Sequence, residues 1–178
     1  MSGKLYGMLL AGGIAGLSAG AHAEDFSARL NGFEEIGGLG AGETGAILSG
    51  GKGTVSLDVD KSQITYKLTY SALSTPVTQA HIHFGKLHVA GGVMVFFCAN
   101  VGTPPAGTPP CPPNGGTVTG TWTAASVVGP AAQNVTPGDF SAILSALNSN
   151  TAYANVHTTK FPAGEIRGQV RRGDRDDD

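Results

Sequence analysis

Three histidines occupy positions at which a β-sheet would gather their side chains. His81 and His83 are two residues apart within Ala80–Phe84. Residues i and i+2 of a strand point to one face, with their bases roughly 6–7 Å apart. His157 lies on the polar face of a second alternating segment, Thr151–Thr158, whose other face is apolar. If the two strands are neighbours in the sheet, the three imidazoles converge.

Three neutral imidazoles are a recognised site for Zn²⁺ or Cu²⁺, and they leave a coordination position open for water or substrate. The Irving–Williams order favours copper for the same nitrogen ligands, so we expect copper as the cofactor, with zinc as the other candidate. The alternative is a His-x-His pair that lies on a polar surface and binds nothing. The spacing therefore predicts a mononuclear metal site made by His81, His83 and His157.

Polar residues near these histidines are candidates for supporting the site. Tyr153 and Asn155 share the face of His157, where they could hydrogen-bond to the imidazoles or simply face solvent. Glu165 and Arg167 are two residues apart on the following strand. Either they pair with each other or bind loop backbone, or they act at the site. In the second case Arg167 steers small anions or Glu165 orients an imidazole through its second nitrogen.

Sulfur-bearing residues offer alternative ligands. Met94 could be a soft axial ligand, although its apolar neighbours favour a place in the core. Cys98 could bind copper as cysteine does in blue-copper sites. The presence of Cys111 and an oxidising compartment favour a disulfide between the two cysteines, which is the pairing we predict. His88 has no assigned role.

An N-terminal signal peptide is predicted over residues 1–23. Lys4 precedes an apolar run, Leu5–Leu17, and Ala21–Ala23 has the small-x-small pattern of a signal-peptidase site. The run is shorter than the roughly 20 apolar residues that span a bilayer, so a permanent membrane anchor is the weaker alternative. The mature chain is expected to begin at Glu24, to be periplasmic or extracellular, and not to insert into the membrane.

The composition excludes several classes of function. Of 178 residues 28 are Gly, 13% are charged, and the net charge is −2, whereas a typical domain has roughly 25% charged residues. Coiled coils need denser charge patterning, and a chain without a basic excess has little to neutralise nucleic-acid phosphates. We therefore expect no nucleic-acid partner. No Ser-His-Asp order, paired-carboxylate motif or phosphate loop assigns catalytic residues.

Short alternating segments separated by turns predict the elements that position the histidines. Strands are expected at Phe26–Phe33, Thr54–Val59, Gln63–Tyr70, Thr78–Phe84, Gly92–Cys98, Gly115–Thr123, Thr151–Thr158 and Glu165–Arg171, with a short edge strand at Thr44–Leu48. One helix is expected to open at Thr136-Pro137 and to bury apolar residues between Phe140 and Leu147. The pattern predicts an all-β, antiparallel Greek-key sandwich or barrel of about eight strands with one short helix, over residues 24–170. Residues 171–178 are expected to form a disordered charged tail.

Several strings resemble one known family. These are Ala80–Gly85 (AHIHFG), Gly92-Val93 before an apolar strand, Tyr153–Thr158 (YANVHT) and Gly164–Gln169 (GEIRGQ). Together they resemble the CHRD domain, which is named for its repeats in chordin and also occurs in single-domain exported bacterial proteins. The resemblance covers Phe26 to Val170 and implies that the two histidine-bearing strands are neighbours.

A more distant similarity concerns the order of the histidines. Copper–zinc superoxide dismutase also places a His-x-His pair on one strand of a Greek-key barrel, with a later histidine completing the copper site. His81, His83 and His157 are similar to that arrangement. No further cluster of histidines and aspartates could build the dismutase zinc site, so the similarity implies a mononuclear copper site.

Three functions follow from these residues. The first is an exported metal-binding protein, such as a copper carrier, buffer or sensor, whose partner is the metal ion. The second is a redox enzyme that uses the same site on superoxide or a peroxide. The third is a structural or adhesive module in which the histidines are incidental. The sequence identifies no protein partner and leaves open whether the chain is an enzyme.

Overall fold

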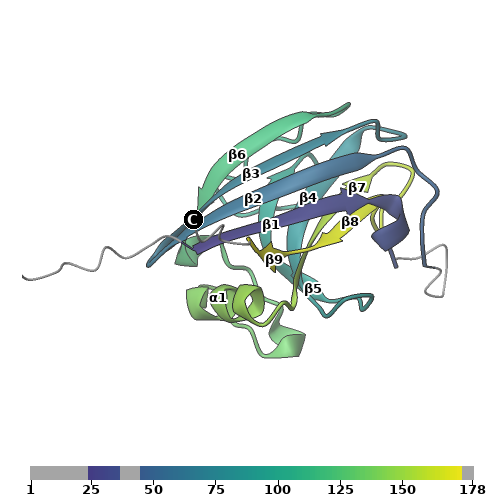
Figure 1. Cartoon of the computed structure of the whole chain (residues 1–178). Helices are drawn as coiled ribbons and strands as arrows, with labels where there is room; N and C mark the ends of the chain where they lie inside the picture. Colours follow the sequence, from purple (N-terminus) through teal and green to yellow (C-terminus); the bar gives the residue numbers. More distant parts are fainter. Residues whose placement is uncertain (1–23, 37–44, 174–178) are drawn as a thin grey trace, which may run out of the picture.

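The computed structural model describes residues 24–36 and 45–173 (Figure 1). Its strands are β1 (Glu24–Asn31), β2 (Lys52–Asp60), β3 (Gln63–Ser71), β4 (Val77–Phe84), β5 (Gly92–Ala99), β6 (Gly116–Trp122), β7 (Ala152–Thr158), β8 (Ile166–Gln169) and β9 (Arg171–Arg172). One α-helix, α1 (Phe140–Asn148), occurs in this part of the chain, with three short 3₁₀ helices, η1 (Gly32–Glu34), η2 (Ala124–Ser126) and η3 (Ala131–Gln133).

All the described strands belong to one antiparallel sheet with the order β5-β4-β7-β8-β1-β2-β3-β6, and β9 adds to β1. The sheet curves until its two ends, β5 and β6, approach each other, which gives a nearly closed barrel (Figure 1). Hairpins join neighbours such as β2 and β3, whereas the connections β3–β4 and β6–β7 join strands that are not adjacent, and the β5–β6 connection links the two ends of the sheet. The prediction of an all-β antiparallel fold of about eight strands with one short helix is confirmed.

The core follows from alternation along the strands. In β2 the side chains of Val55, Leu57 and Val59 are buried, whereas Thr54 and the other intervening residues are exposed. Successive side chains of a strand point to opposite faces, so the apolar set lies inside the barrel. The same alternation continues in β3, which pairs with β2 over its full length.

Side chains close the barrel where no strand ladder does. The indole Nε1 of Trp122 on β6 donates to the carbonyl oxygen of Phe96 on β5 at 2.7 Å. The hydroxyl of Tyr66 on β3 donates to the carbonyl oxygen of Phe97 at 2.9 Å. The exposed edge of a strand carries unpaired backbone groups, and these two donors satisfy such groups on β5.

The helix begins later than the predicted opening at Thr136-Pro137. Its N-cap is Asp139, whose carboxylate accepts a hydrogen bond from the backbone N–H of Ala142 at 3.1 Å. Aspartate is among the strongest N-cap residues because it satisfies amides that have no intrahelical partner. Ile143 and Leu147 are buried against the sheet, as the apolar spacing predicts.

Two predicted segments differ from the structure. The expected edge strand at Thr44–Leu48 is absent over residues 45–48, which are irregular and are held by a bond from Ile47 N to Gly32 O; Thr44 lies outside the described residues. Arg171 and Arg172, assigned to a charged tail, form β9 beside β1. The expected signal peptide, residues 1–23, and residues 174–178 also lie outside the described residues.

The two cysteines form the predicted disulfide. Cys98 at the end of β5 is bonded to Cys111, 13 residues along the chain, and both are buried. The disulfide closes the proline-rich loop that leads from β5 toward β6. None of the helices among the described residues is long and apolar enough to cross a membrane.

Candidate metal centre

The strands that carry the three histidines are neighbours. β4 and β7 pair antiparallel, with His81 opposite Asn155 and His83 opposite Tyr153. The intervening residues, such as Ala80 and Val156, point into the apolar core. The alternation seen in the sequence therefore turns the polar residues of both strands to the face that is directed away from the core.

His81, His83 and His157 form a compact buried cluster. One ring nitrogen from each lies within 4.8 Å of the others, and the imidazoles are 3%, 8% and 7% exposed. Nδ1 of His81 is 3.1 Å from Nε2 of His157. Two nitrogens bound to a tetrahedral ion at the usual 2.0–2.1 Å are about 3.3 Å apart. The observed spacing of this pair is close to that value, so three nearby histidines could hold a metal.

Backbone carbonyls fix the protons of two of these histidines. Nδ1 of His83 donates to the carbonyl oxygen of Gly91 at 2.9 Å, and Nδ1 of His157 donates to that of Pro162 at 3.0 Å. A neutral imidazole has one N–H, so Nε2 of each ring keeps its lone pair. Nε2 of His83 is buried and has no hydrogen-bond partner among the described residues. A bound metal ion or water would satisfy this atom.

His81 has an acceptor beside each ring nitrogen. Its Nδ1 faces Nε2 of His157, whose lone pair is free because Pro162 takes the other proton. Its Nε2 is 3.1 Å from the amide oxygen of Gln79. A neutral His81 carries a single proton and cannot donate to both neighbours. A cation bound by His81 and His157 together would remove this conflict.

The protein environment keeps the imidazoles uncharged. Burial lowers the pKa of His83 to about 3 and the pKa of His157 to about 4. Burial, followed by the neighbouring His157 and His83, lowers the pKa of His81 to about 2. Metals bind neutral imidazole, so these ligands need not lose a proton to bind at neutral pH.

Tyr153 supports His83 from the adjacent strand. Their rings are parallel, at an angle of 4° with centroids 4.9 Å apart. The guanidinium carbon of Arg167 lies 3.4 Å from the centre of the same tyrosine ring. Tyr153 therefore holds the plane of His83, and its hydroxyl accepts a hydrogen bond from Gly91 N at 3.0 Å.

Arg167 binds loop backbone, which is the first of the two roles considered for it. Its Nη2 donates to the carbonyl oxygens of Lys86 and Val89, both at 3.1 Å. The side chain is 1% exposed. Arg167 thus fastens the β4–β5 loop over the sheet and contacts Tyr153, and it makes no hydrogen bond to an imidazole among the described residues.

Glu165 bonds to hydroxyl groups and a backbone amide, and not to an imidazole, among the described residues. Its carboxylate accepts hydrogen bonds from the hydroxyl groups of Ser49, Ser74 and Thr158 and from the backbone N–H of Ser74. Burial alone would raise the pKa of Glu165, but these donors hold it below its usual value. Glu165 joins three segments around the β7–β8 turn. The second nitrogen of His157 is oriented by Pro162 instead.

Asn155 reveals a buried carboxyl group that sequence reasoning missed. Its amide nitrogen donates to both carboxyl oxygens of Glu35, at 2.9 and 3.1 Å. Glu35 is 2% exposed, and burial raises its pKa to about 7, although Asn155, Arg167 and the backbone of Ile36 oppose that shift. Glu35 follows η1 in no recognisable motif. Its proximity to β7 depends on β1 lying beside β8.

The remaining candidates lie outside the cluster. Met94 is fully buried in the apolar core, and Cys98 is committed to the disulfide. His88 is exposed on the β4–β5 loop, with Nε2 3.5 Å from a carboxylate oxygen of Glu34. Of the five histidines in the sequence, His22 lies outside the described residues.

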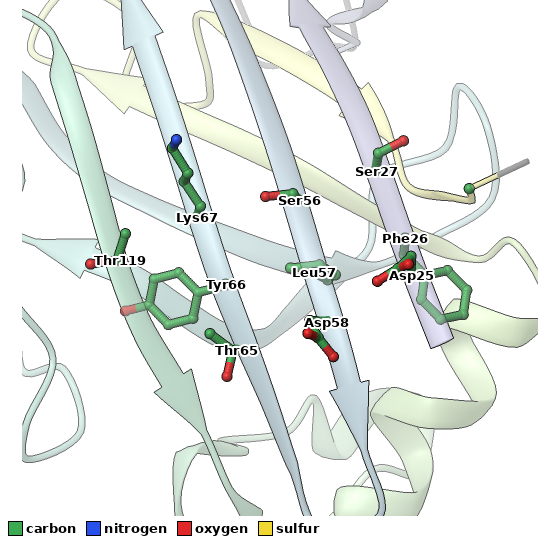
Figure 2. Close-up of a pocket in the computed structure, with 11 residues that line it drawn as sticks. Asp25, Phe26, Ser27, Ser56, Leu57, Asp58, Thr65, Tyr66, Lys67 and Thr119 are labelled. Carbon is green, nitrogen blue, oxygen red and sulfur yellow. The ribbon is translucent and has the colours of Figure 1, made fainter. Parts of the chain in front are cut away.

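A separate groove of about 430 Å³ lies on the exposed face of β1, β2, β3 and β6 (Figure 2). The strand register places Ser27, Ser56, Lys67 and Thr119 in one row across it. None of the residues predicted from the sequence to form the metal site lines this groove. The groove is therefore separate from the histidine cluster on β4 and β7.

Fold and site together define an antiparallel β domain that carries a histidine cluster on the face directed away from its core. The family model of the CHRD domain matches residues 26–170. The chain belongs to the CHRD domain family, as the resemblance of its histidine and GEIRGQ strings implied. No curated protein and no solved structure matches the chain.

Proposed function

We propose that this protein binds one copper ion through His81, His83 and His157. The observation that carries the proposal is the arrangement of protons: Gly91 and Pro162 bind Nδ1 of His83 and His157 and leave both Nε2 lone pairs free within one buried cluster. Three neutral imidazoles with an open position are a donor set for Cu²⁺ or Zn²⁺. Tyr153 and Arg167 support the site through His83, and Asn155 lies on the same face of β7, opposite His81.

Copper is the preferred metal on chemical grounds. Nitrogen ligands bind Cu²⁺ more tightly than Zn²⁺ in the Irving–Williams order. An exported protein also meets copper more readily than one in the reducing cytosol. Zinc is the second metal to test at the same ligands.

Export is part of the proposal. A disulfide between Cys98 and Cys111 persists in oxidising compartments, and thiols in the cytosol are kept reduced. Together with the signal-peptide pattern of residues 1–23, this supports a periplasmic or extracellular protein that begins at Glu24. The similarity to the histidine order of copper–zinc superoxide dismutase stays a hypothesis.

The test is titration of the purified protein with Cu²⁺, followed by electron paramagnetic resonance. We expect one ion to bind with micromolar or tighter affinity and to show nitrogen hyperfine structure. His81→Ala and His157→Ala should each lose this signal because each removes one of three ligands. His88→Ala is the matched control, since His88 is exposed and 3.5 Å from Glu34 rather than in the cluster; it should bind like wild type.

Equal and weak binding by wild type, His81→Ala and His157→Ala would contradict the proposal. The chain would then be a structural or interaction module with incidental histidines. Binding that is lost in His88→Ala would place the copper elsewhere on the surface.

A redox enzyme is the second candidate, because three protein ligands leave a coordination position for a small molecule. Copper supplies one-electron chemistry when bound. The copper-loaded protein should then remove superoxide much faster than the same concentration of free copper. His157→Ala should abolish the excess. A copper-loaded protein no faster than free copper would favour a carrier, buffer or sensor.

A further inference from the structure

Gln79 lies beside the histidine cluster and was not recognised in the sequence. It is on β4, two residues before His81, so Gln79, His81 and His83 point to the same face. The register places Gln79 directly opposite His157 on β7. An irregularity of β4 between Val77 and Gln79 fixes this register. Gln79 is therefore the neighbour of two of the three histidines.

Gln79 contacts the nitrogen of His81 that does not face the other imidazoles. The amide oxygen of Gln79 is 3.1 Å from Nε2 of His81, and Nδ1 of His81 is 3.1 Å from Nε2 of His157. An amide oxygen only accepts hydrogen bonds. It therefore favours the tautomer of His81 that carries its proton on Nε2.

In that tautomer Nδ1 of His81 has a lone pair directed at the lone pair of His157 Nε2. The proton of His157 cannot relieve this contact, because it is bound to the carbonyl oxygen of Pro162. A metal ion that accepts both lone pairs satisfies Nδ1 of His81 and Nε2 of His157, while the N–H groups of the same rings stay bonded to Gln79 and Pro162. Gln79 and Pro162 thus play equivalent parts, each holding the proton of one ligand on the side away from the ion.

We propose that Gln79 is a positioning residue that makes His81 bind the metal through Nδ1, whereas His83 and His157 bind through Nε2. This inference rests on the proposed function. It assigns one ligand atom to each histidine and gives the site a mixed donor set, Nδ1 from one ring and Nε2 from two.

The first test measures metal binding in matched variants. Gln79→Leu keeps similar bulk but has no acceptor, so His81 is free to take the other tautomer. Loss of such a partner lowers metal affinity by about 10–100-fold in comparable sites, and we expect that loss for both Cu²⁺ and Zn²⁺. Gln79→Glu keeps an acceptor and should bind at least as tightly as wild type. Gln63→Leu is the control, because Gln63 is exposed at the start of β3, a strand that neighbours neither β4 nor β7.

The second test reads the tautomers directly. In the Zn²⁺-loaded protein, which is diamagnetic, long-range ¹H–¹⁵N correlation spectra identify the protonated and the metal-bound nitrogen of each histidine. We expect His81 to be protonated at Nε2 and bound at Nδ1, with the reverse for His83 and His157. In Gln79→Leu the His81 signals should shift toward the other tautomer or broaden, and in Gln63→Leu they should not change.

The outcomes separate the inference from the proposed function. A wild-type protein that binds neither ion overturns both. A wild-type protein that binds with His81 coordinated through Nε2 overturns the inference alone, as does Gln79→Leu with unchanged affinity and unchanged tautomer. If Gln79→Leu fails to fold, Gln79→Glu decides: folded protein with Nε2 of His81 protonated supports the inference, and coordination through Nε2 overturns it.

Discussion

Several single atoms on the face that carries the three histidines are buried without a hydrogen-bond partner in the described part of the chain. Among the described residues, four buried side-chain atoms have no hydrogen-bond partner: Nε2 of His83, Oδ1 of Asn155, Nη1 of Arg167 and Oε1 of Gln169. All four belong to β4, β7 and β8, and their residues alternate with core residues. Buried polar atoms are nearly always bonded in native proteins, so exceptions gathered on one face indicate bound water or ligand there.

Glu35 makes the free energy of unfolding depend on pH. Its pKa is raised by burial from 4.5 to about 7, so between those values the folded chain keeps a proton that the unfolded chain has lost. The contribution of Glu35 to the free energy of unfolding therefore falls as the pH rises through this window. Glu35→Gln should be more stable than the wild type at pH 8 by on the order of 3 kcal/mol, with little difference at pH 4.

Urea denaturation in the presence of a chelator measures this difference without any metal. Gln keeps an amide oxygen for Asn155, so lost hydrogen bonding is not the source of the change. The same gain at pH 4 and pH 8 would contradict a raised pKa for Glu35.

Gly91 is a second residue whose role is local. A Cβ at this position would collide with the carbonyl group of Phe84, while the carbonyl oxygen of Gly91 binds Nδ1 of His83. Gly91→Ala should lower stability by about 1–3 kcal/mol through overpacking and should weaken copper binding by displacing that oxygen. Thermal melting and copper titration check both effects. In Gly50→Ala the nearest atom, Ala72 O, is 3.7 Å away, so this control should change neither.

At the scale of elements, the closing of the barrel depends on side chains that reach β5. Tyr66→Phe removes the donor to the carbonyl oxygen of Phe97 and leaves that buried group unpaired. We expect a loss of about 1–2 kcal/mol in the free energy of unfolding, measured with urea. Thr117→Val, which removes an exposed hydroxyl bonded to Thr69, should stay within about 0.5 kcal/mol of wild type. Equal effects of the two variants would contradict a special role for Tyr66.

The strands were predictable wherever one face is apolar. Val55, Leu57 and Val59 alternate with polar residues, and β2 lies where this pattern predicts it. The segment at 45–48 has a β-branched residue, Ile47, but Leu48 is 91% exposed, and its amides find no partner strand. A strand forms only where a partner strand is available, and the local sequence pattern does not show whether there is one. The two residues of β9 do find a partner, because β8 pairs with β1 only at Asn31 and leaves Phe26 and Ser27 of β1 open on that side.

The sequence indicated three histidines as candidate ligands and Tyr153 and Arg167 as candidate neighbours, but it did not indicate the acceptors that hold the imidazoles. His81, His83 and His157 stand out by type and alternation. Gly91 and Pro162 act through backbone carbonyl oxygens, which every residue has, so nothing in their side chains announces the contact. Glu35 comes from a segment 120 positions before Asn155. Its place depends on the pairing of β1 with β8.

For the whole molecule, the disulfide is the main covalent constraint. Cys98 and Cys111 close a short loop, and a loop of this size is expected to add about 3 kcal/mol by restricting the unfolded chain. A Cys98→Ala/Cys111→Ala variant should be less stable than the oxidised wild type by this amount in urea. A reductant should bring the wild type to the level of the variant and leave the variant unchanged. A variant as stable as the oxidised wild type would contradict the expectation.

The global arrangement needed more than local pattern. The connections β3–β4 and β6–β7 join strands that are not adjacent in the sheet, so several sheet neighbours, such as β4 and β7, are far apart in the chain. Alternation alone could not place β4 beside β7. The likeness to the CHRD family implied that pairing, and the register of β4 on β7 confirms it.

The dependence of His157 on Pro162 ties the interior of the cluster to a surface turn. Residues 159–164 join β7 to β8, and the carbonyl oxygen of Pro162 is the acceptor for Nδ1 of His157. A change in the length of this turn would move the carbonyl oxygen of Pro162 and so reorient the imidazole of His157, although all three histidines would be retained. If the cluster binds copper as proposed, the length of this turn would tune the metal site without a change in any of the three histidines.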